Sequence, residues 1–156
     1  MRPDVGPDGS DVPPRWSHPQ VPPRIKDIGA SKGIDFASPA NPRTPNTLLA
    51  HVLLGWALET GGEQKQNELV EAIFRQYHTS TLYPDKDNLV AAATECGLDA
   101  NAARAALSSQ ERCDATAREV EANARVGGVP HFTINGKHAV HGAQPPDALL
   151  EAFDMA

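Results

Sequence analysis

The sequence predicts an α+β protein in which a run of helices is followed by one β-hairpin and a final helix. Three observations support this prediction. Apolar residues recur at helical spacing from Pro45 to about residue 126. Asn135-Gly136 then separates two short apolar-rich runs, and Gln144-Pro145-Pro146-Asp147 opens an amphipathic segment. We therefore expect a mostly helical body with a single two-stranded ribbon.

The beginning of the chain differs in composition from the rest. Most of the 14 prolines lie before residue 46, and apolar periodicity is almost absent before Ile25. We expect residues 1–24 to form a proline-rich extended or disordered arm and residues 25–156 to form the folded domain. Trp16 is the residue of the arm that we expect to dock, as a packing anchor.

Residues 45–109 are predicted to be helical. Four helices are expected, one from a cap at Asn46 or Thr47 to a stop at Gly61-Gly62, and three over about residues 64–77, 87–96 and 101–107. Asp99 is the expected cap of the last of these helices. The apolar residues of the second helix are expected to be buried: Leu69, Val70, Ile73, Phe74 and Tyr77.

A helix over residues 110–126 is predicted next, and it must stop at Gly127-Gly128, where glycine provides a left-handed cap. One face of this helix carries apolar residues at offsets of four, three and four: Cys113, Ala117, Val120 and Ala124.

The hairpin that follows is predicted to turn at Asn135-Gly136, because both residues tolerate the positive φ of a two-residue type I′ turn. In that register Ile134 faces Lys137, Thr133 faces His138 and His131 faces Val140. His131, Thr133, His138 and Val140 then share one face, opposite to the face of Phe132, Ile134, Ala139 and His141. The final helix has an expected apolar stripe of Ala148, Leu149, Ala152 and Phe153.

Several motifs together resemble the DsbA-like thioredoxin-fold family, in particular its FrnE-type branch. They are Gly-Val-Pro-x-Phe at 128–132, Asn135-Gly136, Gly-Ala-Gln-Pro-Pro at 142–146, Pro45-Asn46-Thr47-x-x-Ala50-His51, the helix from Leu69 to Tyr77, and Glu95-Cys96-Gly97-Leu98-Asp99. The resemblance covers roughly residues 28–155. It implies an incomplete thioredoxin-like fold, in which 45–109 is a helical insertion and 110–156 holds a helix, a cis-proline, the hairpin and a helix.

The resemblance also implies a function and a site. The function is that of a thiol–disulfide oxidoreductase, and the site has a cis-proline at Pro130 with Val129 presenting its backbone N–H and C=O to an extended peptide, a thiol substrate or glutathione. His131, Asn46 and His51 are the further substrate-binding residues. For Asn46 and His51 a structural alternative stays open, in which Asn46 caps its helix and His51 packs.

The sequence departs from the family at the nucleophile. Oxidoreductase members begin with a strand that runs into Cys-x-x-Cys at the start of a helix, and this sequence contains no Cys-x-x-Cys. We therefore expect the first β-α-β unit to be absent, no residue to be catalytic and the 156 residues to be inactive as a disulfide reductase or oxidase. A truncated gene product or a fragment would account for this departure.

The two cysteines do not replace the missing pair. Cys113 lies 13 residues before Val126 on one predicted helix, hence on the order of 20 Å from the proline site. Cys96 is expected to end a helix, where the carbonyl end of the dipole raises a thiol pKa. Reduced, buried cysteines are one interpretation, and a disulfide between Cys96 and Cys113 is the other.

Composition excludes several classes of partner. A net charge of −6 and a pI near 5.4 provide no basic stripe for nucleic acid. The sequence shows neither a secretory start nor the roughly eighteen-residue apolar run of a membrane span, so we expect a cytoplasmic protein. No metal site is expected, because His131 and His138 would lie about 7 to 8 Å apart at their Cα atoms.

Three functions remain open. The first is the FrnE-type oxidoreductase without its nucleophilic half. The second is a glutathione-dependent isomerase or transferase of the same fold, with glutathione as cofactor. The third is a non-catalytic module that binds peptides at the cis-proline groove or forms a homodimer through the hairpin edge.

Overall fold

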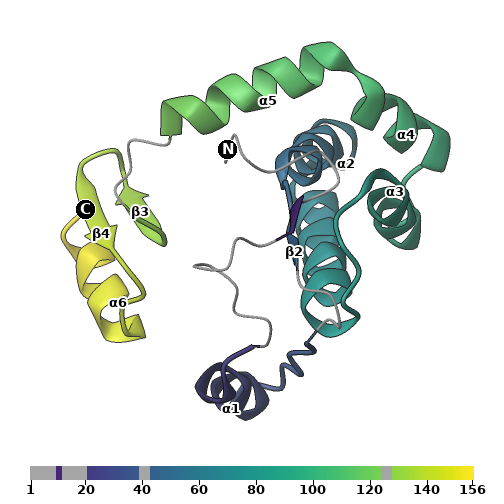
Figure 1. Ribbon diagram of the computed structural model, residues 1–156. Coiled ribbons are helices and arrows are strands. Elements are labelled where there is room, and N and C mark those ends of the chain that lie inside the picture. Colours follow the sequence, from purple (N-terminus) through teal and green to yellow (C-terminus); the bar gives the residue numbers. More distant parts are fainter. Residues whose placement is uncertain (1–9, 12–20, 39–42, 124–127) are drawn as a thin grey trace. The chain divides into compact units, whose positions relative to one another are not determined.

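The computed structural model describes residues 10–11, 21–38, 43–123 and 128–156 (Figure 1). The chain divides into two compact units, Met1–Arg118 and Glu119–Ala156. Most of the described residues are helical, and the described strands form two antiparallel pairs. The predicted α+β class, with a helical segment, a hairpin and a final helix, is confirmed.

In the first unit, the short strands β1 (Ser10–Asp11) and β2 (Arg43–Thr44) pair antiparallel. Helix α1 (Pro23–Ser31) was not predicted, and it begins with proline at its first turn, where the missing N–H is harmless. The expectation of an arm over residues 1–24 falls mostly outside the described residues, as does that of a docked Trp16. The last two residues of the predicted arm, Pro23 and Arg24, belong to α1.

Helix α2 (Leu48–Phe74) is the long element of the first unit, and it is broken at Gly62, where φ is 72° and ψ is −173°. Only glycine adopts this backbone conformation readily, so the predicted stop at Gly61-Gly62 is confirmed. The chain continues into the π-helix η2 (Arg75–Thr79). Phe74 was predicted to be buried, and this is wrong: it is 55% exposed at the end of α2.

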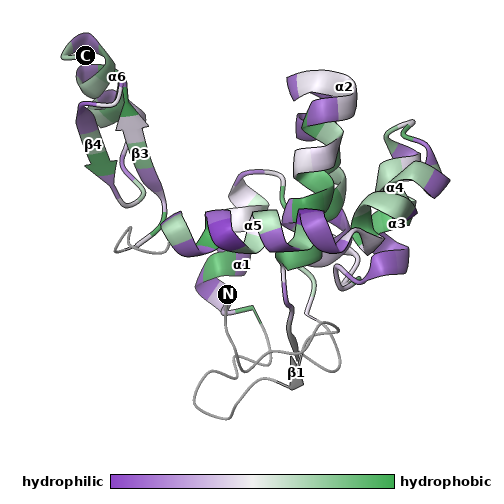
Figure 2. Cartoon of the chain, turned by 90° about the horizontal axis from the view of Figure 1, so that it is seen from above, coloured by the Kyte–Doolittle hydropathy of each residue, from purple (hydrophilic) through white to green (hydrophobic). Residues whose placement is uncertain are grey.

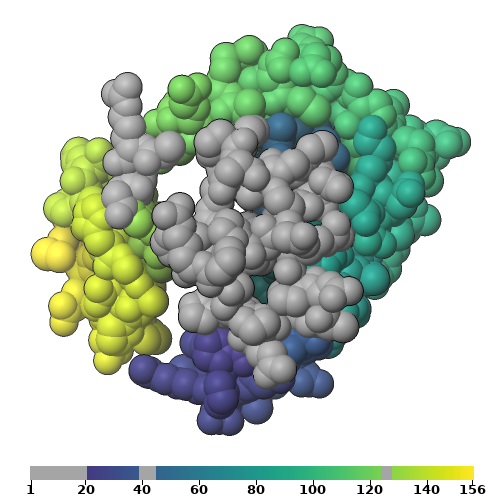
Figure 3. All heavy atoms as spheres, in the orientation of Figure 1, coloured from purple at the N-terminus to yellow at the C-terminus, as the bar shows by residue number. Residues whose placement is uncertain are grey.

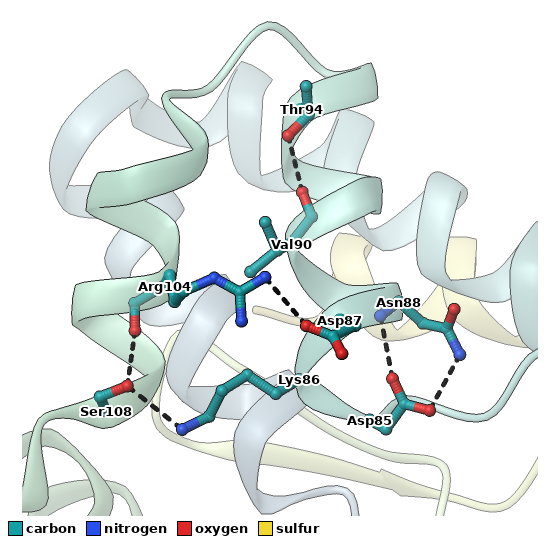
Figure 4. A network of polar contacts seen from close by, with 8 residues as sticks. All are labelled: Asp85, Lys86, Asp87, Asn88, Val90, Thr94, Arg104 and Ser108. Carbon is teal, nitrogen blue, oxygen red and sulfur yellow. Dashed lines mark hydrogen bonds and ion pairs between the residues drawn. The ribbon is translucent and has the colours of Figure 1, made fainter.

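Helices α3 (Lys86–Glu95) and α4 (Ala100–Ser108) pack on α2 and on each other. Asp85 and Asp99 cap them by accepting hydrogen bonds from the N–H groups of Asn88 and Ala102, at 2.9 and 2.7 Å. Figure 4 shows the polar surface of this pair, where Arg104 reaches across to Asp87.

The hydrophobic core of the first unit lies among these three helices, whose apolar residues are green in Figure 2. Its largest fully buried side chains come from each helix in turn: Leu53, Leu69, Leu89 and Leu107. The predicted helical segment over residues 45–109 therefore builds a core of its own.

Helix α5 (Gln110–Asn123) crosses the boundary between the two units. Arg112 on α5 forms an ion pair with Glu59 on α2 at 2.7 Å. Cys113, Ala117 and Val120 are half-buried, as their spacing predicts. The predicted continuation to residue 126 and the glycine stop involve residues 124–127, which lie outside the described residues.

The second unit contains β3 (His131–Ile134), β4 (His138–His141) and α6 (Pro146–Asp154). Helix α6 packs on β4, and Figure 3 shows the atoms of hairpin and helix, in yellow-green and yellow, directly against one another. Ala152 is buried and Leu149 half-buried, but Phe153 is 58% exposed. Phe153 is therefore the member of the predicted apolar stripe that the structure leaves exposed.

No helix in the described ranges combines the length and the apolar composition needed to cross a bilayer.

Candidate functional site

The candidate site begins at the Val129–Pro130 peptide bond, which is cis, as the resemblance implies. Val129 is 91% exposed. No hydrogen bond joins its N–H or C=O to another residue of the described part of the chain. The carbonyl of Pro130, in contrast, accepts a hydrogen bond from Gly142 N–H at 2.8 Å. Within the described residues, the N–H and C=O of Val129 are therefore without a hydrogen bond, whereas the carbonyl of the next residue, Pro130, has one.

Strand β3 follows this bond and, within the described residues, pairs with β4 alone. Its other edge therefore has backbone groups without a strand partner in that part of the chain. An edge of this kind can accept an extended peptide by strand addition.

The register predicted for the hairpin is wrong by one residue. The structure pairs His131 with His141, Phe132 with Val140, Thr133 with Ala139 and Ile134 with His138. The position of the turn is as predicted, since φ is positive at both Asn135 and Gly136 and Lys137 N–H donates to Ile134 C=O at 3.1 Å, but the loop between the paired Ile134 and His138 has three residues and not two. Lys137, however, stays in the loop as an extra residue before β4 begins, and this shifts every pair.

The shift changes which side chains share a face. Phe132, Ile134, His138 and Val140 now lie together, and all but Phe132 are half-buried. The opposite, more exposed face carries His131, Thr133, Ala139 and His141. His131 was predicted to share a face with His138. In the structure it shares a face with His141 instead.

His131 and His141 are in direct contact. Their Nδ1 atoms are 3.0 Å apart and their ring centroids 4.5 Å apart. Nε2 of His131 lies 3.3 Å from the hydroxyl oxygen of Thr133. Sequence reasoning missed this contact because it depends on the register, which a single loop residue decides.

Asn46 and His51 lie in the first unit, at the start of α2. The N-cap of α2 is Thr47, whose side chain makes no capping hydrogen bond, while Asn46, one residue earlier, accepts a hydrogen bond from Leu48 N–H through Oδ1 at 3.0 Å. His51 is exposed one turn further on, which contradicts the alternative that it packs. Val129, Pro130 and His131 belong to the second unit.

Cys96 and Cys113 are both free thiols. Cys96 is the C-cap of α3, and its carbonyl accepts a hydrogen bond from Lys65 Nζ at 2.7 Å. Burial raises the pKa of the Cys96 thiol, and the nearby carboxylates of Glu95 and Glu68 raise it further. The predicted direction is confirmed, with burial as the main cause.

An aromatic cluster that the sequence reasoning did not single out surrounds His78 on η2. The rings of Phe36, Phe74 and Tyr77 meet the His78 imidazole edge-on, with centroids 5.6, 5.8 and 4.9 Å away. Burial lowers the pKa of His78 and raises that of Tyr77. The signal in the sequence was Gln76-Tyr77-His78 at a helix end, but periodicity alone does not reveal a π-helix.

Comparison with known proteins points to one family. The model of the family described as DSBA-like thioredoxin domain matches residues 6–154, a span that begins earlier than the resemblance read from the motifs. A similar solved structure is the crystal structure of a probable DsbA oxidoreductase from Streptomyces coelicolor, with a TM-score of 0.68 and 27% sequence identity.

The structural match covers 85% of this chain and 57% of the Streptomyces chain. The 156 residues thus span little more than half the length of that protein. No protein with a curated description matches the chain.

Proposed function

Because the chain belongs to the family of DsbA-like thioredoxin domains, we propose that it carries the substrate-docking part of a thiol–disulfide oxidoreductase of the FrnE-type branch. One observation carries this proposal: Val129 is 91% exposed, and its backbone groups are free within the described residues, beside the unpaired edge of β3. We place the protein in the cytoplasm, where two free cysteines stay reduced.

An extended substrate segment fits this arrangement by pairing with Val129 as an added strand. Its cysteine would then lie near Pro130 and His131. In the first unit, His51 is exposed to solvent, and in the part of the chain that the structure describes, the hydrogen bond of the Asn46 side chain is made by Oδ1, which leaves Nδ2 as a donor for the substrate. We propose these two residues as further contacts to the substrate.

The nucleophile of the reaction lies elsewhere. Disulfide exchange starts from a thiolate, and the raised pKa of Cys96 lowers the thiolate fraction at neutral pH. The sequence holds two cysteines, separated by sixteen residues and therefore not in a Cys-x-x-Cys. We propose that a first β-α-β unit outside these 156 residues supplies that motif, which agrees with the 57% coverage of the Streptomyces chain.

The apolar surface of the second unit supports the same proposal. Four large apolar side chains of the hairpin and α6 are exposed by 40% to 66%: Phe132, Leu150, Phe153 and Met155. A two-stranded hairpin is marginally stable unless it is covered. A neighbouring part of a thioredoxin-like fold would cover this surface, with residues 45–109 as the helical insertion and 110–156 as the docking part.

An insulin-reduction assay tests the catalytic half of the proposal. We expect the 156-residue protein to reduce insulin no faster than its thiol-free variant Cys96→Ser/Cys113→Ser. Both cysteines lie outside the docking residues, so the variant is a matched control. Turnover well above that of the variant would refute the proposal that these residues are inactive alone.

Backbone recognition at Val129 can be tested separately. The probe is an extended peptide with one cysteine blocked as a methyl disulfide, titrated against the ¹⁵N-labelled protein. We expect Val129→Pro, which removes the N–H, to weaken binding by roughly tenfold, the equivalent of about 1.4 kcal/mol. Val129→Ala keeps the backbone and should bind like the wild type. Equal binding by all three proteins would exclude this docking mode.

Two measurements address the alternative functions. Saturable binding of glutathione in calorimetry would favour the isomerase and transferase branch. A symmetric dimer in analytical ultracentrifugation, lost on a Thr133→Pro change in β3, would favour the dimerisation module, because proline removes an N–H from the pairing edge.

A further inference from the structure

The exposed face of the hairpin brings two imidazole rings together across the strands. His131 and His141 are direct partners in the antiparallel register. Gly142 N–H donates to Pro130 C=O at 2.8 Å, just beyond this pair, so His131 and His141 occupy a position without hydrogen bonds between them. At such positions the Cα atoms approach to about 4.5 Å and the side chains are closest. The backbone thus holds both rings near one point.

The distance between the two Nδ1 atoms is compatible with both atoms binding one metal ion. When two nitrogens bind the same ion, each at about 2.05 Å, they lie about 2.9 Å apart if the N–metal–N angle is a right angle and about 3.3 Å apart if it is tetrahedral. The two Nδ1 atoms are 3.0 Å apart, between these limits. We propose that His131 and His141 chelate a divalent late transition-metal ion, of the class of Zn²⁺ and Ni²⁺, through their Nδ1 atoms.

Thr133 is placed to support the proposed chelate. Its hydroxyl oxygen lies 3.3 Å from Nε2 of His131. For Nδ1 to bind a metal, the ring proton of neutral His131 must sit on Nε2, where it can donate to this oxygen. Such a hydrogen bond fixes the tautomer and the ring orientation of metal-bound histidines. The ion would take the place of the proton between the two Nδ1 atoms, and the ring that carries this proton would then hold it on its own Nε2, so that both neutral rings bind the ion through Nδ1.

The chelate would leave positions on the ion open. In the described part of the chain, no three side chains of His, Cys, Asp or Glu lie close enough together to hold one metal ion. His141 and Thr133 are exposed, so water can complete the coordination. The site would therefore be an open, two-ligand site, whose occupancy follows the free metal concentration.

Calorimetric titration with Zn²⁺ alone, and then with Ni²⁺ alone, tests the proposal. We expect His131→Ala and His141→Ala each to weaken binding by at least about tenfold, and Thr133→Val by roughly tenfold. His138→Ala is the matched control, because His138 belongs to the same hairpin but lies on the opposite face. All four variants keep both cysteines, so binding by thiolates does not distinguish them.

A second measurement guards against variants that merely disturb the hairpin. In the wild-type protein, Zn²⁺ should shift the Nδ1 resonances of His131 and His141 and leave those of His138 in place. The proposal is overturned if the wild type shows no saturable binding, if His138→Ala loses as much affinity as the other two histidine variants, or if the Nδ1 resonances do not move.

Discussion

The two units of the molecule differ in how much apolar surface they bury. In the first unit, α2, α3 and α4 enclose a continuous core whose central leucines are at most 2% exposed. In the second unit, Ala152 is the one buried apolar side chain among the described residues, while Val129 and Met155 are 91% and 66% exposed. The first unit therefore has a core of its own, and the second leaves most of its large apolar side chains exposed.

This difference explains where function can reside. Burial of apolar area is the main favourable term in folding, so the buried side chains of α2, α3 and α4 serve stability. The second unit buries few side chains. Among its described residues, Val129 is 91% exposed, one edge of β3 has no strand partner, and His141 is exposed. Binding groups are commonly exposed on elements that a stable scaffold holds.

The largest expected effect on stability comes from truncating a buried leucine of the first unit. Leu53→Ala removes a side chain that is 0% exposed, and it should lower the free energy of unfolding by about 3 kcal/mol. Phe153→Ala removes a larger side chain that is 58% exposed, and it should cost less than about 1 kcal/mol. Urea unfolding followed by circular dichroism measures both. A loss at Phe153 as large as that at Leu53 would show that the second unit has a core after all.

The next largest effect distinguishes two glycines of α2 by the cost of adding a Cβ atom. Gly62 has φ of 72° and ψ of −173°, and an added Cβ would touch nothing within 4 Å, so Gly62→Ala is penalised by backbone strain alone. We expect a loss of about 1 to 3 kcal/mol in the free energy of unfolding. Gly55→Ala also meets nothing within 4 Å but lies in regular helix, so it should gain about 0.5 to 1 kcal/mol. Losses of equal size would point to packing instead of strain.

The first unit was largely predictable because its signals are local. Apolar spacing, the Gly61-Gly62 stop and the Asp99 cap each act within one or two turns of helix, and the structure shows all three. Helix α1 was missed because the proline-rich composition up to Pro23 predicted an extended arm, whereas Pro23 stands in the first turn of the helix. Phe74 was misassigned because periodicity does not show where a helix passes into a π-helix.

The second unit was predictable in its elements but not in its register. Asn135-Gly136 located the turn, yet nothing local decides whether Lys137 joins β4 or stays in the loop. That choice moves His131 from Val140 to His141 and creates the histidine pair. The site residues at 129–131 came from motifs of a family, since periodicity carries no information about substrate contacts.

A smaller effect separates capping from surface charge in the first unit. Asp85 caps α3 through the N–H of Asn88, so Asp85→Ala should cost about 1 kcal/mol. Asp87, two residues later, pairs with Arg104 but its side chain is 82% exposed, so Asp87→Ala should cost under about 0.5 kcal/mol. Thermal unfolding of the two variants compares them. The reverse order would mean that the ion pair drawn in Figure 4 is more important than the cap.

The smallest effect concerns pH and the aromatic cluster around His78. Burial holds the pKa of folded His78 below its ordinary value near 6.5, so folding disfavours its protonation. The stability contributed by the neutral ring is therefore present above that value and is lost as the pH falls through the folded pKa. Glu59 and Glu68 also have lowered pKa values, but their contributions are lost only in more acidic solution, below their ordinary value of 4.5. Between pH 7 and 5, the free energy of unfolding measured with urea should thus fall more steeply for the wild type than for His78→Gln, whose side chain does not titrate. Parallel curves for the two proteins would mean that the four-ring cluster leaves the imidazole as free to take up a proton as it is in the unfolded chain.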